Sequence, residues 1–469
     1  MKETLKYIES FLTMHKFKIN ANKTNLFNDF VSDPENIDAV KEIQENQKKM
    51  LDKWTLKNRV DDIVQQYVTL PNATVNKKYE SKIDFIKLGW NDIVFSEFTN
   101  LEPSGLNYDS SEEIITGNPF TSGDLKTNFL FRLEGESDDS VLHEKPMTII
   151  INPDPKSLWK NIDSDKNDVF WKEDNVAEVG KFLDKKIVIS SKRGRSHANV
   201  GSFRDDDYKF ENFSETGWSI LAVSDGAGSA SESRQGSKLA CEWVISYFQE
   251  NFTTDFLKDF DETLLKHNTN PDADSQKKIS LFVYNNLSKA AHFVHKKLEE
   301  FALKNYKELK DFHSTLIFAL VKKYHFGYAI LTFGVGDCPI GLMNKDKSEI
   351  KLMNWLDVGE FGGGTRFITM PEIFQSDKFS TRFGFKLIQD FSYLMLMTDG
   401  IYDPKFVVEA NLEKIESWNE FLEDLKGKND DNIAVDFSYQ NLEIANQLSN
   451  WMDFWNPGNH DDRTLAIIY

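Results

Sequence analysis

The sequence predicts an α+β protein whose larger part is an α-β-β-α arrangement, two packed β-sheets covered by helices. Short, partly β-branched apolar runs, such as residues 220–223, indicate buried strands. Helical periodicity fills long stretches between two blocks of such runs, as over residues 276–309. Glycine next to aspartate ends several of the strands abruptly. Helices between two blocks of strands fit a sheet-on-sheet core with helices on both outer faces.

Length and charge limit the possible partners. At 469 residues the chain is too long for one ordinary core, so we expect two or three domains. Its 75 acidic residues against 56 basic ones leave a net charge of −19, which argues against nucleic acid or an anionic membrane as a partner. Cys241 and Cys338 lack the spacing of a metal knuckle or redox pair and fit a reducing compartment. We find no export signal and no apolar run near the roughly 18 residues of a membrane span, and expect a cytoplasmic protein.

Residues 1–68 are predicted to be a helical N-terminal module. Apolar residues from Leu5 to Leu12 share one helical stripe, and a second helical pattern follows Asp33. Pro34 suits the first turn of that second helix. The module has no catalytic constellation, and we interpret it as a packing or partner-docking element.

Residues 69–152 are predicted to be a small β-sandwich, because short apolar runs alternate there with turn clusters rich in glycine and proline. The motifs LPNA at 70–73, ITGNP at 115–119 and SGD at 122–124 resemble immunoglobulin-like repeats of bacterial proteins. An irregular β extension of the following domain is the alternative. Residues 153–185, charged but containing Trp159 and Trp171, are interpreted as a linker anchored by these two rings.

The catalytic domain is expected over residues 186–469. It begins with a strand at 186–190 and a polar loop at 191–200, and a helix follows that Ser231 or Ser233 caps. Strands predicted at 314–321, 328–333, 338–342 and 350–353 are expected to form one antiparallel meander, and the glycines at 362–364 a flexible loop. The polar loop and the residues just after it gather four basic side chains that we assign to phosphate recognition, since arginine offers a two-pronged hydrogen-bond donor. They are Arg193, Arg195, His197 and Arg204.

Aspartates recur at the ends of apolar strands far apart in the chain. Asp225 follows one such strand, Asp399 follows another, and Asp461 lies just before a third. A further acidic run occupies residues 205–207, and Asp337 lies on a glycine turn. A fold that brings strand ends together can gather such oxygen ligands around Mg²⁺ or Mn²⁺. A plain solvated turn at each position is the alternative.

Seven motifs in order resemble the metal-dependent protein phosphatases (PPM, type 2C). The matching motifs are RDDD at 204–207, AVSDGAGSA at 222–230, STL at 314–316, GVGD at 334–337, GTRFIT at 364–369, MTDG at 397–400 with DP at 403–404, and DDRT at 461–464. The resemblance is to the bacterial branch found beside von Willebrand A proteins and kinases in tellurite-resistance-like gene clusters. It implies a phosphoprotein substrate, with a Ser/Thr kinase and a von Willebrand A domain protein as further partners.

The resemblance also implies site roles. Asp225 bridges two metal ions, with the Gly226 carbonyl on the first and Asp399 and Asp461 on the second. Asp205 and Asp206 orient metal-bound water, and Asp337 serves a weaker third ion. Two such cations, Mn²⁺ or Mg²⁺, would activate a water for attack on phosphoserine or phosphothreonine.

Departures from the family pattern leave two roles open. Better-known relatives carry a histidine after Asp-Gly that has been assigned as the acid for the leaving group, whereas this chain has Ala227, so His197 is one candidate. The phosphate-clamping arginine usually lies five residues before the acid aligned with Asp206, where this chain has Gly201. A catalytically weak scaffold with the phosphatase fold is one alternative function. An adhesion module led by the immunoglobulin-like segment, which would require export, is another.

Overall fold

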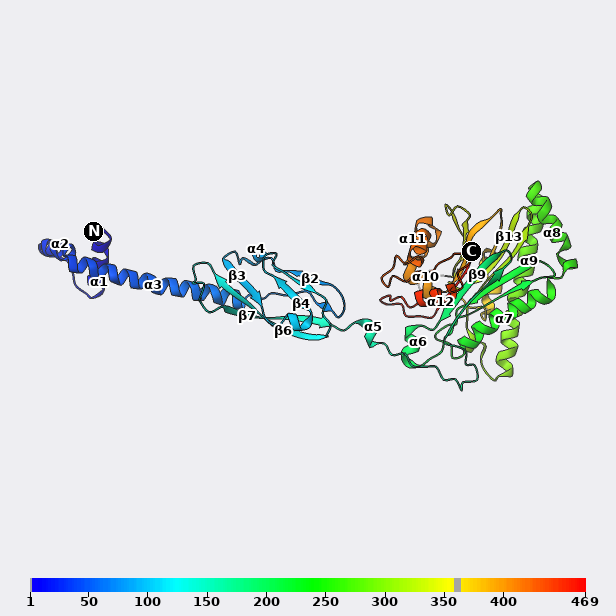
Figure 1. Ribbon diagram of the computed structural model, residues 1–469, viewed down its shortest axis with the longest axis horizontal. Helices are drawn as coiled ribbons and strands as arrows, with labels where there is room; N and C mark the ends of the chain where they lie inside the picture. The colour runs from blue at the N-terminus through cyan, green and yellow to red at the C-terminus, as the bar shows by residue number, and fades with distance from the viewer. Residues whose placement is uncertain (1, 358–363) are drawn as a thin grey trace. The chain divides into compact units, whose positions relative to one another are not determined.

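The computed structural model describes residues 2–357 and 364–469, and the chain has the mixed α+β fold that the sequence predicts. It forms two compact units, Met1–Leu158 and Trp159–Tyr469 (Figure 1). Of the predicted glycine loop, Gly362 and Gly363 lie outside the described residues. Among the helices that are described, none combines the length and the apolar character needed to cross a bilayer.

Three helices begin the first unit: α1 (Lys2–Met14), α2 (Thr24–Ser32) and α3 (Pro34–Gln65). The Asp33 carboxylate accepts the amide of Glu35 and caps α3, and Pro34 occupies its first turn as expected. A small apolar cluster joins the three helices around Ile8, Val31 and Val40.

Two small sheets complete the first unit. The four-stranded sheet has the order β1-β7-β6-β3, and the three-stranded sheet has the order β2-β5-β4. Their bounds are β1 (Ala73–Thr74), β2 (Tyr79–Lys82), β3 (Ile93–Phe98), β4 (Leu106–Asp109), β5 (Ile114–Gly117), β6 (Gly123–Leu133) and β7 (His143–Asn152), with the short helix α4 (Phe85–Leu88) between β2 and β3. Alternate residues of β6, including Phe129 and Phe131, are fully buried beside Trp90. Ile63 of α3 lies in the same core, so the end of the long helix packs on the strands.

The second unit contains two larger sheets. The five-stranded sheet is antiparallel, with the order β10-β11-β12-β13-β16, and the six-stranded one has the order β15-β14-β17-β18-β9-β8. The strands of the first are β10 (Asp207–Phe213), β11 (Trp218–Ser224), β12 (Leu316–Tyr324), β13 (Gly327–Val335) and β16 (Phe383–Ile388). Those of the second are β8 (Asn175–Phe182), β9 (Lys185–Lys192), β14 (Ile340–Asn344), β15 (Ile350–Leu352), β17 (Phe391–Met397) and β18 (Arg463–Ile468).

The two large sheets share a buried core. Leu221 and Val223 of β11 belong to the cluster that also contains Leu394 of β17, so these strand faces pack together. The alternate residues Ile220 and Ala222 face a second cluster with α7 (Ser233–Asn251), α8 (Thr254–Thr269) and α9 (Ala273–Lys304). The other face of the six-stranded sheet packs against the helices of the C-terminal part, which are α10 (Asp399–Phe406), α11 (Ile415–Leu425) and α12 (Ile444–Trp451).

The predicted four-strand meander is wrong after β13. The neighbour of β13 is β16, whereas β14 pairs with β17 in the other sheet. Gly336 turns with a φ of +107° between β13 and β14, and the chain passes there from one sheet to the other. Both β13 and β14 are buried on both faces, so their apolar patterns do not reveal which sheet each one joins.

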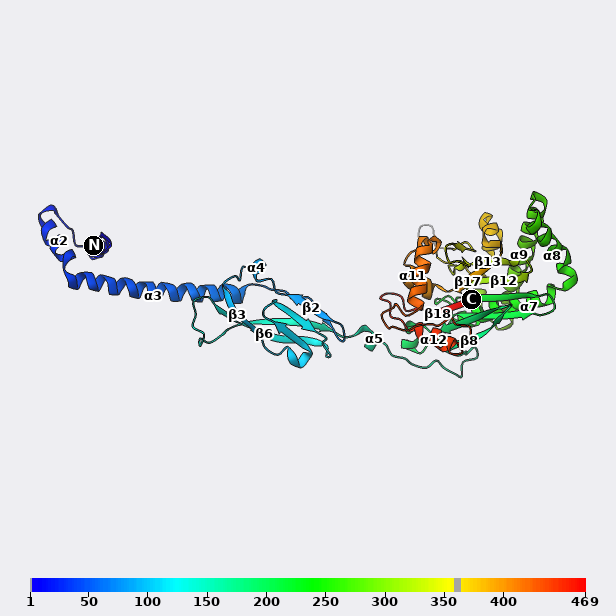
Figure 2. The ribbon, with the colours of Figure 1, turned by 45° about the horizontal axis from the view of Figure 1, so that its top comes forward.

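The expected linker over residues 153–185 differs from the structure. Residues from Trp159 onward belong to the second unit, and β8 pairs along its whole length with β9 (Figure 2). Of the expected linker, only residues 153–158, which include the short helix α5 (Pro155–Leu158), lie before the second unit. The charged residues of β8 lie on the edge of the sheet, and this edge position explains why the strand resembles a solvated connection in the sequence.

Candidate metal centre

The predicted carboxylates meet where strands of both large sheets end. Asp206 directly precedes β10, Asp225 directly follows β11, and Asp399 begins α10 one residue after Thr398. The hydroxyl groups of Thr398 and Thr464 each donate a hydrogen bond of 2.8 Å to Asp206 Oδ2. Thr398 directly follows β17 and Thr464 lies within β18, both strands of the six-stranded sheet, whereas Asp206 borders the five-stranded sheet. These bonds therefore join the two sheet ends.

The carboxylates of the cluster are buried and repel one another, and both effects raise their pKa values. Burial raises the pKa of Asp225 well above its usual value, and the negative charges of Asp399 and Asp206 raise it further. Burial likewise raises the pKa of Asp399, with Asp337 and Asp461 adding to the shift. Carboxylates held this close favour a bound cation or a shared proton.

Two oxygens of the cluster lack partners. Asp206 is 1% exposed, and its Oδ1 atom has no hydrogen-bond partner among the described residues; the same holds for Asp337 Oδ1. The other Asp337 oxygen accepts the Thr365 hydroxyl at 2.7 Å. A buried, unpaired carboxylate oxygen is costly unless it meets a donor or a cation.

Gly226 lies beside this cluster, at a position where only glycine fits. A Cβ atom there would come within 2.6 Å of the Asp205 carbonyl oxygen. Gly226 also forms a β-bridge with Ser314, and the amide of Thr315 donates to the Asp225 carbonyl at 2.7 Å. The glycine therefore brings the Asp225 turn against the acidic run.

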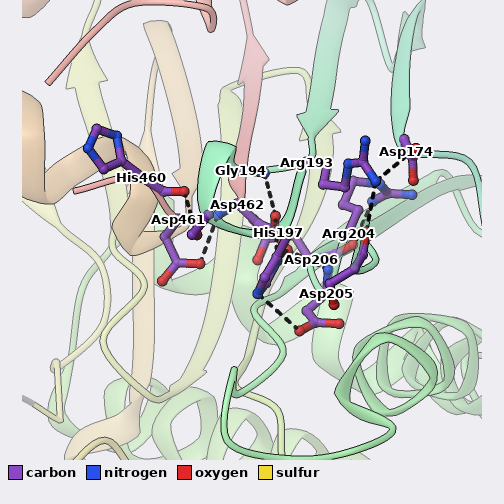
Figure 3. A network of polar contacts seen from close by, with 12 residues as sticks. Asp174, Arg193, Gly194, His197, Arg204, Asp205, Asp206, His460, Asp461 and Asp462 are labelled. Carbon is purple, nitrogen blue, oxygen red and sulfur yellow. Dashed lines mark hydrogen bonds and ion pairs between the residues drawn. The ribbon is translucent and has the colours of Figure 1, made fainter. Parts of the chain in front are cut away.

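A second polar network surrounds Asp462, which sequence reasoning did not select (Figure 3). Its carboxylate is 2% exposed and accepts the backbone amides of Gly194 and Asp205 at 2.5 Å each. His197, on α6 (Arg195–Val200), contacts both of its oxygens through Nδ1 at 3.1 Å. The opposite ring atom, Nε2, lies 3.9 Å from Asp205 Oδ2. The only signal in the sequence was a second aspartate after Asp461.

The pair of His197 and Asp462 is charged. Burial alone would lower the pKa of His197, but Asp462 raises it to about 9. Burial alone would raise the pKa of Asp462, yet the hydrogen bonds from His197 and the two amides hold it below its usual value. Each partner therefore stabilises the ionised form of the other.

The predicted arginines are bound to the protein itself. Arg193 donates to the Ser202 carbonyl at 2.8 Å and pairs with Asp174 at 3.2 Å. Arg204 donates to the Glu173 carbonyl at 3.0 Å, to Ser191 Oγ at 2.7 Å and to the Asp206 carbonyl at 2.5 Å.

The third predicted arginine, Arg195, donates to the Asp453 carbonyl at 2.7 Å and lies over the Trp455 ring. Arg193 and Arg204 are buried, and their contacts hold the loop rather than present a cation to the cluster.

Lys172 is a further residue that the sequence did not indicate. Its buried ammonium group donates to the Asp206 carbonyl at 2.7 Å and to Asp207 Oδ2 at 2.8 Å. Ser237 Oγ lies 3.3 Å away. A lone lysine in a charged segment does not stand out in the sequence, because only the fold brings it into contact with Asp206 and Asp207.

The fold and the cluster define an α+β domain with a candidate divalent-metal centre where its two large sheets end. The sequence model of the family described as Protein phosphatase 2C matches residues 193–452, more than half of the chain, and the chain therefore belongs to this family. No curated protein matches the chain.

Several solved structures are similar over this part of the chain. A bacterial serine phosphatase is 12% identical with a TM-score of 0.36, covering 61% of this chain and 97% of its own. The serine/threonine phosphatase Stp1 from Staphylococcus aureus is 14% identical with a TM-score of 0.35, covering 62% and 96%. The catalytic domain of the serine threonine protein phosphatase PstP, in complex with two manganese ions, is 14% identical with a TM-score of 0.35, covering 63% and 98%.

Proposed function

We propose that this chain hydrolyses phosphoserine and phosphothreonine in protein substrates with the help of two divalent cations, Mn²⁺ or Mg²⁺. The observation that carries the proposal is the meeting of carboxylates from both large sheets at one end of the sandwich, around Asp206. Membership of the protein phosphatase 2C family supports the reaction class.

The residues present fit such cations. The assigned donors are all oxygens, which Mg²⁺ and Mn²⁺ prefer, and the unpaired Asp206 and Asp337 oxygens call for a positive partner. Cys338 Sγ lies within 4.8 Å of the Asp225 and Asp337 ligand atoms, but burial raises the pKa of this thiol well above its usual value, which keeps it protonated and a poor ligand. We assign Asp225, Asp399, Asp461 and the Gly226 carbonyl to two ions. Asp205 and Asp206 would orient the attacking water, and Asp337 would hold a weaker third ion. When bound, the ions would offset the repulsion, attract a phosphate dianion and activate water.

His197 is the proton donor that we propose for the leaving oxygen. Its Nδ1 atom is held by Asp462, which orients the ring and leaves Nε2 on the side of Asp205. A histidine fixed in this way by a carboxylate can deliver a proton from its other nitrogen. His197 would thus take the role of the leaving-group acid, for which better-known relatives have a histidine where this chain has Ala227.

The finer parts of the proposal rest on the sequence resemblance. We propose that residues 69–152 are an immunoglobulin-like module and that the three packed cores of the second unit support an α-β-β-α layering. We also propose a cognate Ser/Thr kinase and a von Willebrand A domain protein as partners in a bacterial stress system. The two free cysteines support a cytoplasmic location.

Activity on a phosphothreonine peptide, with and without Mn²⁺, tests the function. We expect hydrolysis that requires metal and that Asp225→Asn or Asp399→Asn reduces by at least ~10³-fold, because each change removes a ligand. Asp274→Asn, an exposed carboxylate on α9 that pairs with Lys278, is the matched control and should retain activity. Full activity in excess chelator would contradict the mechanism, and folded protein without any hydrolysis would favour the scaffold alternative.

A further inference from the structure

The middle of α3 is a helix with every residue exposed. Residues 41–55 are all solvent-exposed, whereas Val40 packs on α1 and α2, and Leu56 and Val60 pack on the strands of the first unit. Figure 1 shows α3 running from α1 and α2 to these strands. A free helical stretch of this length is marginal in water, because most helical stability in proteins comes from packing one face. This stretch therefore needs a partner.

An apolar seam runs along this free stretch. Ile43, Met50 and Trp54 are 42%, 65% and 66% exposed, and Leu51 beside them is 63% exposed. With Gln47 they follow the alternating three- and four-residue spacing of a coiled-coil seam. Large apolar side chains in such a row are the signature of a helix that pairs with another helix.

The charges beside the seam change sign along the helix. On one flank, Glu35 and Glu42 are followed by Lys49 and Lys53. Over the whole free stretch and its borders, the N-terminal half is acidic and the C-terminal half is basic. In a parallel pair of identical helices like charges would face each other, whereas an antiparallel pair would set the acidic half of each against the basic half of the other.

We propose that the seam formed by Ile43, Gln47, Met50 and Trp54 binds the same seam of a second copy of this chain, in antiparallel orientation. The surface is self-complementary, as a two-fold interface requires. When the four seam positions of two copies are superposed in antiparallel orientation, Ile43 of one copy lies opposite Trp54 of the other, and Gln47 lies opposite Met50. This assembly does not depend on the phosphatase proposal.

Sedimentation velocity of the full chain over a wide range of micromolar concentrations tests the dimer. We expect a dimer for the natural sequence and the monomer mass for Met50→Glu/Trp54→Glu. Both positions are exposed in the single chain, so the double variant should fold, and unchanged circular dichroism checks this. Ile86→Glu, 78% exposed on α4, is the matched control and should remain dimeric. A natural sequence that stays monomeric, or a dimer that survives the double variant, would overturn the proposal.

Charge reversal tests the antiparallel arrangement. Glu35→Lys/Glu42→Lys should weaken the dimer at low salt, because two basic halves would then face each other. Adding Lys49→Glu and Lys53→Glu to the same chain should restore it. Failure of the fourfold variant to dimerise would contradict the pairing of acidic and basic halves.

Disulfide trapping tests whether the two α3 helices pair in antiparallel or parallel orientation. Both natural cysteines are buried, so a cysteine introduced on α3 reacts alone. In a mixture of Glu42→Cys and Lys53→Cys chains under mild oxidation, we expect mainly the mixed crosslink. Crosslinks of Glu42→Cys chains with one another would indicate parallel pairing, and capture of a different protein with no self-crosslink would identify another occupant. Either result would overturn the proposal.

Discussion

The ammonium group of Lys172 donates a hydrogen bond of 2.7 Å to the backbone carbonyl of Asp206. The same group forms an ion pair with Asp207, so Lys172, which lies just before β8, contacts two residues of the acidic run. Burial lowers the pKa of Lys172, and the neighbouring Asp207 acts in the opposite direction. The position of Asp206 in the candidate metal centre therefore depends on a segment outside the motifs that carry the family resemblance.

We expect Lys172→Met to destabilise the second unit by about 3–5 kcal/mol, because it leaves the largely buried Asp207 carboxylate and the Asp205 and Asp206 carbonyls without their donor. Urea unfolding followed by tryptophan fluorescence measures the change. Lys181→Met, an exposed lysine on β8, is the control and should change stability little. An unaltered unfolding curve for the Lys172 variant would show that the pair contributes nothing.

The boundary of the second unit gives another prediction. A chain of residues 159–469 should unfold cooperatively, because it is a compact unit that keeps β8 and Lys172. A chain of residues 186–469 should lose cooperative unfolding, since β9 then becomes an exposed edge and the acidic run loses its lysine. Thermal denaturation compares them. Equal melting temperatures would mean that the segment before residue 186 is dispensable.

The acidic cluster predicts an inverse dependence of stability on pH without metal. The pKa of Asp225 and of Asp399 is raised in the folded state, so the folded state binds more protons than the unfolded state. Stability should therefore fall as pH rises from the usual aspartate pKa, about 3.9, through the folded-state values. Thermal unfolding in chelator at a series of pH values measures this, and a rise over that range would contradict it.

Mn²⁺ should reverse this loss at neutral pH, because a ligand that binds only the folded state stabilises it. Asp225→Asn should raise the stability of the metal-free protein at neutral pH, because it removes one of the mutually repelling buried charges. The same variant should respond less to Mn²⁺. Asp274→Asn again serves as control, and it should show the Mn²⁺ response of the natural sequence.

His197→Gln tests the proton donor. We expect the kcat on a phosphoserine peptide to fall by about 10²–10⁴-fold, with a smaller fall on p-nitrophenyl phosphate, whose leaving group needs no proton. His325→Gln, exposed in the turn between β12 and β13, is the control. An equal fall on both substrates would indicate that His197 only positions Asp462.

Arg204→Ala distinguishes a structural arginine from a phosphate clamp. Its guanidinium group bonds Glu173, Ser191 and Asp206, so we expect a loss of stability of about 1.5–3 kcal/mol, with KM unchanged in the enzyme that remains folded. A clamp would instead raise KM without loss of stability. Chemical denaturation and steady-state kinetics on the same preparation separate the two outcomes.

Local patterns in the sequence predicted the strands that carry the cluster. An apolar run stopped by Asp-Gly, as at β11, determines both a buried strand and the carboxylate at its end, because burial and turn formation depend on a few adjacent residues. The same reasoning located Asp399 and Asp461 next to β17 and β18. Pro34 and the spacing of the apolar residues after it likewise predicted the long helix α3.

Only the tertiary structure decided which strands pair and which distant groups meet. β14 pairs with β17, but both faces of β14 are buried, so its apolar pattern does not indicate which strand lies beside it. Lys172 and Asp462 acquire their roles from contacts with residues tens to hundreds of positions away. Such contacts form only when the cores close, so the residues that hold the metal centre in place carry no local signal, whereas the carboxylates at strand ends do.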